Sequence, residues 1–121
     1  MHTQNDDIQQ LEMTIQQAQA IAERGRKVLE LVANPTFKDI IDDGYLLQEA
    51  ARLAHLMADS NLTPAVRADV ERSLTGPGSL KQYLMRIIHQ GRMAEESITD
   101  AQEELVNAME EDAHGYKGED F

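Results

Sequence analysis

Two long runs of apolar residues, one near each end of the chain, repeat every three or four positions. This spacing is typical of the a and d positions of helices that pack side by side in a coiled coil. The first run consists of Ile8, Leu11, Ile15, Ala18, Ala22, Gly25, Leu29 and Val32. The second consists of Leu80, Leu84, Ile87, Gly91, Ala94, Ile98, Ala101, Leu105 and Ala108. The pattern therefore predicts two long helices that pack on each other.

Small residues occupy the middle of both runs. When the two runs are set antiparallel, Ala22 falls beside Gly91 and Ala18 beside Ala94, with larger residues meeting on either side. A glycine inside a helix costs about 0.5–1 kcal/mol relative to alanine, so a glycine on the packing face indicates close approach of the helices. The predicted helix-packing seam consists of Ala18, Ala22, Gly25, Gly91 and Ala94.

Turn signals divide the chain between these two runs. Asn34-Pro35 ends the first helix, because proline disfavours helical backbone in the residue before it, and Thr36 is then placed to cap the next helix. Two short helices, over residues 37–43 and 45–58, are either separated at Asp43-Gly44 or joined as one bent helix. Thr63-Pro64 predicts the start of a further helix to about residue 74. The segment 75–78 (TGPG) is the strongest break signal, and Ser79 follows it as a cap.

These elements predict an all-α fold in a chain of 121 residues. A single helical domain is expected over residues 1–111, built as a long antiparallel hairpin. Its arms are the N- and C-terminal helices over residues 6–32 and 79–111, and residues 36–74 form a small helical head. Residues 112–121 have no apolar periodicity and are expected to form a flexible acidic tail.

The net charge of −11 is unevenly distributed, since residues 79–121 alone contribute −6. Such a chain is expected to be repelled by nucleic acid and by anionic membranes. A weak exception is the basic cluster of Arg24, Arg26 and Lys27. No apolar run approaches the roughly 18 residues of a membrane span, and the N-terminus lacks the pattern of a signal peptide. Direct nucleic-acid binding and membrane association are therefore not expected.

Acidic residues recur along the last helix at intervals of seven to eight positions. They form either a solvated helix face or a strip that binds a basic partner. The candidate strip consists of Glu95, Glu96, Glu103, Glu104, Glu110, Glu111 and Asp112.

The residues offer little basis for catalysis. The chain has no cysteine, and its four histidines (His2, His55, His89 and His114) lack the spacing of a metal site. No serine stands in a nucleophile-elbow setting, and no glycine-rich phosphate loop is present. No catalytic residue, metal ion or cofactor is predicted, and the protein is expected not to be an enzyme.

Self-association is expected instead. Two helices packed through alanine and glycine bury little apolar surface, so a second copy is predicted to cover part of them. Ile21 and Val28 widen the apolar stripe of the first helix, and Met93 and Met109 do the same on the last helix.

Two stretches resemble small acidic helical proteins of tailed bacteriophages. They are residues 34–53 (NPTFKDIIDDGYLLQEAARL) and residues 76–96 (GPGSLKQYLMRIIHQGRMAEE), together 41 of the 121 residues. The resemblance implies a phage setting, in the virion or the host cytoplasm, and carries over no catalytic residue. The expected function is that of a non-enzymatic structural or assembly protein of a phage particle. The alternative is an acidic inhibitor or DNA mimic that occupies a basic groove of a host or defence protein.

Overall fold

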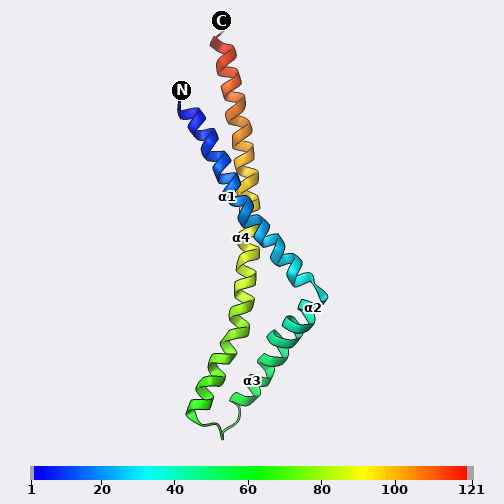
Figure 1. Ribbon diagram of the computed structural model, residues 1–121. Coiled ribbons are helices and arrows are strands. Elements are labelled where there is room, and N and C mark those ends of the chain that lie inside the picture. Colours follow the sequence, from blue (N-terminus) through cyan, green and yellow to red (C-terminus); the bar gives the residue numbers. More distant parts are fainter. Residues whose placement is uncertain (1, 120–121) are drawn as a thin grey trace. The chain divides into compact units, whose positions relative to one another are not determined.

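A computed structural model of the protein describes the backbone of residues 2–119 and the side chains of residues 5–113. Within these residues the backbone forms helices and no strand, which confirms the predicted all-α class (Figure 1). The elements are α1 (His2–Ala33), α2 (Pro35–Phe37), the π-helix η1 (Lys38–Glu49), α3 (Ala50–Met57) and α4 (Pro64–Glu119).

The chain divides into two units. Unit 1 combines residues 1–26 with residues 89–121, and unit 2 consists of residues 27–88. Unit 1 therefore contains most of α1 and the C-terminal half of α4, whereas unit 2 contains all the shorter elements. The two units are described separately below.

The helix end predicted at Asn34-Pro35 is present, but Asn34 rather than Thr36 caps the helix that follows. Asn34 has extended backbone (φ −67°, ψ 129°) directly after α1. Its Oδ1 accepts hydrogen bonds from the amides of Thr36 (2.8 Å) and Phe37 (3.3 Å). Asparagine is a favoured N-cap, and Pro35 occupies the first helical position, where no amide is needed. The prediction that Thr36 caps this helix was wrong.

No break occurs at Asp43-Gly44. Helical backbone continues from Pro35 to Met57, and Gly44 lies inside the π-helix η1. Of the two arrangements that the sequence allowed, the separated helices are wrong and the single continuous segment is observed. The wider turn of a π-helix absorbs extra residues without ending the helix, and π-turns are frequent at functional positions.

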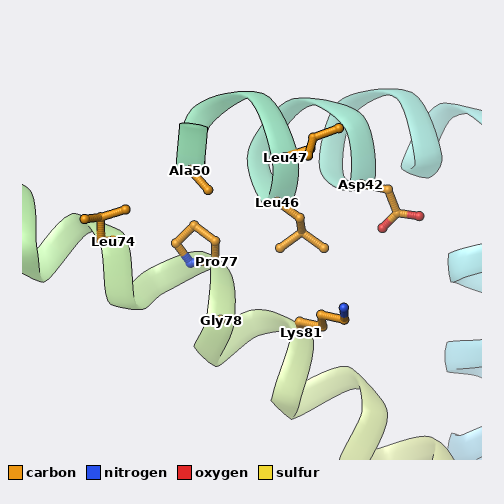
Figure 2. A pocket seen from close by; sticks show the side chains of 8 residues that line it. All are labelled: Asp42, Leu46, Leu47, Ala50, Leu74, Pro77, Gly78 and Lys81. Atoms are coloured by element: carbon orange, nitrogen blue, oxygen red, sulfur yellow. The ribbon is translucent and has the colours of Figure 1, made fainter. Parts of the chain in front are cut away.

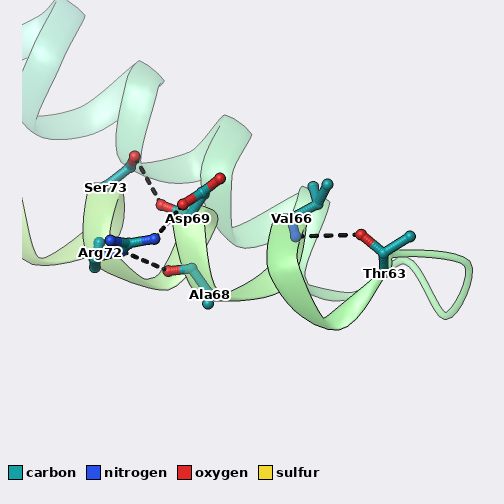
Figure 3. A network of polar contacts seen from close by, with 6 residues as sticks. All are labelled: Thr63, Val66, Ala68, Asp69, Arg72 and Ser73. Atoms are coloured by element: carbon teal, nitrogen blue, oxygen red, sulfur yellow. Dashed lines mark hydrogen bonds and ion pairs between the residues drawn. The ribbon is translucent and has the colours of Figure 1, made fainter.

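The connection between α3 and α4 spans residues 58–63, where a loop was expected. The Thr63 hydroxyl accepts a hydrogen bond from the amide of Val66 (3.3 Å), which confirms the predicted cap (Figure 3). The guanidinium of Arg67 donates to the carbonyls of Met57 (3.0 Å) and Asp59 (3.1 Å). One arginine thus joins the first turn of α4 to the end of α3.

The predicted break at residues 75–78 is wrong, since α4 runs through it with Pro77 inside the helix. Proline removes one helical hydrogen bond and crowds the preceding turn. Gly76, directly before Pro77, has no Cβ to crowd the proline ring. A Cβ on Gly76 would collide with the hydroxyl of Tyr45, so this glycine also makes room for η1 to approach α4. Ser79 is accordingly an interior residue of α4 and caps nothing.

The C-terminal end of α4 overlaps the predicted tail. The backbone is helical to Glu119, so the stretch 112–119 continues the helix. The side chains of residues 114–121 lie outside the described residues, and the flexibility of the tail stays a prediction.

Candidate protein-interaction surfaces

The five predicted seam residues are all buried in unit 1. Ala18, Ala22 and Ala94 form one cluster, in which Ala22 is only 1% exposed, and Ile98 packs against it. Small side chains on both helices let the backbones approach closely. The structure therefore brings these residues together at the contact between α1 and α4.

The closest contact of the seam joins two glycines. A Cβ on Gly91 would lie 2.8 Å from the Cα of Gly25 and 3.5 Å from the carbonyl oxygen of Ile21, which precedes Ala22. Gly91 thus packs closest to Gly25, one turn along α1 from Ala22, beside which the sequence placed it. Ala18 and Ala94, the other predicted pair, share one cluster. Two facing glycines allow a closer backbone contact than glycine facing alanine.

An ion pair flanks this contact. Nη1 of Arg26 lies 3.0 Å from Oε1 of Glu95, and both side chains are about half exposed (57% and 48%). An exposed pair of this kind contributes about 0–1 kcal/mol. The pair also links α1 and α4 on one side of the glycine contact. Glu95 is therefore already engaged within the chain.

The candidate acidic strip lies on the surface of α4. Its seven residues, Glu95, Glu96, Glu103, Glu104, Glu110, Glu111 and Asp112, are all exposed. Unit 1 as a whole holds 14 acidic and 4 basic residues, whereas unit 2 holds 8 and 7. Unit 1 therefore carries a net charge of −10 and unit 2 only −1. The binding role of the acidic strip stays a prediction.

Unit 2 contains an apolar groove between η1 and α4, with a volume of about 600 Å³. Figure 2 shows Leu46 pointing from η1 toward Pro77 on α4, with Asp42 and Lys81 at one end. Leu47 stands at the groove and is 64% exposed. The groove is lined by Asp42, Leu46, Leu47, Ala50, Leu74, Pro77, Gly78 and Lys81.

Sequence reasoning missed this groove for a definite reason. It exists because η1 continues through Gly44 and α4 continues through Pro77, whereas the sequence left a break at Gly44 open and predicted one at residues 75–78. The available signal was the apolar spacing of Leu46 and Ala50, which shows one face of a helix but not its partner.

A second ion pair lowers the pKa of a carboxyl group. Nε of Arg52 donates to Oε2 of Glu49 (3.0 Å), and its Nη2 contacts Oε1. This hydrogen bonding lowers the pKa of Glu49 from its ordinary value. The pair lies on the surface of unit 2, one turn apart along the helix, so the shift reflects local helix pairing.

Among residues 5–113, no group of three or more histidines and carboxylates is placed to hold a metal ion. His55 and His89 are exposed, and the side chains of His2 and His114 lie outside the described residues. None of the described helices has a segment long and apolar enough to cross a membrane.

Comparison with known proteins adds no identification. No protein-family model, curated protein or solved structure matches this chain.

Proposed function

We propose that this protein is a non-enzymatic structural or assembly protein of a bacteriophage particle that acts through helix–helix contacts, including contacts with copies of itself. The phage setting, in the virion or the host cytoplasm, rests on the sequence resemblance. The proposal includes the predicted architecture of an antiparallel helical hairpin with a small head at residues 36–74.

The observation that carries the proposal is the placement of apolar side chains. Among the described residues, no large side chain is less than 2% exposed, and four of the eight buried hydrophobic residues are alanines. Twelve large hydrophobic side chains are at least 40% exposed. Because the interior is small, contact with another protein would cover apolar side chains that the chain itself leaves exposed. The exposed residues are Met13, Ile21, Leu29, Leu31, Ile40, Leu47, Val66, Tyr83, Met85, Met93, Val106 and Met109.

The groove of unit 2 is the surface that best suits a second copy. Unit 2 is nearly neutral, so two copies of it meet without strong repulsion. Asp42 and Lys81 lie together at one end of the groove. In a two-fold dimer the same surface of each copy faces the other. The apolar lining and Leu47 would be covered by the same contact.

The test is absolute mass by light scattering on a size-exclusion column, with Leu47→Glu as the disrupting variant. We expect a dimer or larger closed assembly that becomes monomeric in the variant, because a carboxylate would be buried in an apolar contact. Ile40→Glu is the matched control, since Ile40 lies on the same π-helix and is 60% exposed but does not line the groove. A wild-type monomer at every concentration would refute self-association.

A second candidate function is favoured by the charge of unit 1. An acidic inhibitor or DNA mimic would present the exposed carboxylates of α4 to a basic groove of a host or defence protein. The light-scattering measurement separates the two candidates, because a clean monomer favours the inhibitor and a stable dimer favours the assembly role.

A further inference from the structure

Unit 1 contains a groove that the proposed dimer does not use. Beyond the glycine contact, α1 and α4 separate toward the ends of the chain (Figure 1). A groove of about 460 Å³ lies between them. Its lining residues are Asp7, Gln10, Leu11 and Thr14 from α1 and Glu104, Asn107, Ala108 and Glu111 from α4.

Polar and acidic residues line most of the groove, around a small apolar floor. Leu11 and Ala108 are half-buried and give it an apolar floor, while Gln10, Thr14 and Asn107 supply hydrogen-bonding groups. The lining on α1 extends over eight residues, or seven steps along the helix, from Asp7 to Thr14, and the lining on α4 is equally long. At 1.5 Å per residue this is about 10 Å, or two helical turns.

Charge identifies the kind of partner. Asp7, Glu104 and Glu111 are exposed at the groove, and none of the residues with described side chains forms an ion pair with them. They belong to a unit whose net charge is −10, counted from residues 1–26 and 89–121. A second copy of unit 1, a nucleic acid or an anionic membrane would each bring more negative charge. The complementary occupant is cationic.

We infer that this groove binds a basic amphipathic α-helix of a partner protein. The apolar face of that helix, with anchors at positions i, i+3 or i+4 and i+7, lies on Leu11 and Ala108. Its lysine and arginine residues face the three carboxylates. This site is separate from the groove of unit 2, so it does not depend on self-association.

The probe is a fluorescently labelled 14-residue peptide of leucine and lysine with leucine at helical spacing, titrated into the full chain in about 0.15 M salt. The groove variant carries Asp7→Asn, Glu104→Gln and Glu111→Gln. We expect it to bind the peptide about tenfold more weakly than the wild type, because three charges that face the peptide are removed.

The chain offers a close control, since an acid stands immediately before each groove acid. The control variant carries Asp6→Asn, Glu103→Gln and Glu110→Gln, none of which lines the groove. Both variants lose three charges from the same helices, so general attraction of the peptide to an acidic protein weakens equally in both. Docking in the groove predicts that the control variant keeps most of the wild-type affinity.

Three outcomes would overturn the inference: no binding, equal weakening in the two variants, or equal binding of a peptide with the same composition in scrambled order. Circular dichroism of both variants checks that helix content is unchanged. The Leu47→Glu variant of unit 2 is expected to bind the peptide like the wild type. A monomeric wild-type protein would therefore not affect the interpretation of the peptide titration. In the same way, absence of peptide binding would not affect the interpretation of the light-scattering result.

Discussion

At the scale of single residues, three glycines of α4 have different surroundings. Gly91 packs directly on the backbone of Gly25, and Gly76 leaves space for the hydroxyl of Tyr45. A Cβ on Gly78 would meet no atom within 4 Å. The sequence does not distinguish these three glycines, because only their neighbours in the fold determine whether a side chain is tolerated.

This contrast predicts opposite effects of the same substitution. Gly91→Ala is expected to destabilise the protein and Gly91→Leu to do so more strongly, by about 1–3 kcal/mol, because the added atoms meet backbone. Gly78→Ala is expected to stabilise it by about 0.5–1 kcal/mol, because alanine is the better helix former. Thermal and urea unfolding measure both. An unchanged free energy of unfolding in Gly91→Leu would contradict close packing at this contact.

The packing face was predictable from the sequence, whereas its closest contact was not. All five residues from Ala18 to Ala94 in the predicted seam are buried. Heptad spacing identifies which residues face a partner helix, but sliding the helices by one turn preserves that pattern. The contact between Gly25 and Gly91 depends on how closely the two backbones approach, a three-dimensional quantity with no local signal.

At the scale of elements, local break signals were overruled by their surroundings. Gly44 and Pro77 both mark breaks in a sequence read alone, and both lie inside helices. Thr63 and Asn34, in contrast, act as caps through hydrogen bonds made within three residues. The helix end before Pro35 and the cap at Thr63 were therefore predictable, whereas the caps expected at Thr36 and Ser79 are not formed. The expected breaks at Gly44 and Pro77 are absent because packing between η1 and α4 supports a continuous helix.

The connection between α3 and α4 gives a prediction at this scale. Arg67→Ala is expected to lower the free energy of unfolding by about 1–2 kcal/mol, because a half-buried guanidinium donates to two carbonyls. The control is Arg72→Ala. Its side chain is 75% exposed and pairs with Asp69 within one helical turn, so we expect a change below about 0.5 kcal/mol. Chemical denaturation of both variants measures the difference, and equal losses would contradict a bridging role for Arg67.

At the scale of the whole molecule, charge is divided between the two units. Unit 1 carries −10 and unit 2 carries −1. The net charge follows directly from the sequence. The concentration of negative charge in one unit does not, because unit 1 combines residues 1–26 with residues 89–121. The groove of unit 1 also depends on this joining, since its walls lie about a hundred residues apart in sequence.

This division predicts that salt acts selectively. Raising sodium chloride from about 0.05 to 0.5 M shortens the screening length to a few ångströms and weakens repulsion within unit 1. We expect amide hydrogen exchange to slow in residues 5–26 and 89–113, with a smaller change in residues 27–88. Mass spectrometry of peptic fragments resolves the two sets. Equal slowing in both would indicate a general salt effect and contradict self-repulsion in unit 1.

The discontinuity of unit 1 also has a consequence for biosynthesis. Unit 2 is continuous in sequence and complete once residue 88 has left the ribosome. Unit 1 cannot form until the C-terminal half of α4 has emerged, so the alanine and glycine face of α1 stays uncovered until then. During synthesis, all residues of unit 2 are therefore available before the two segments of unit 1 can pack together.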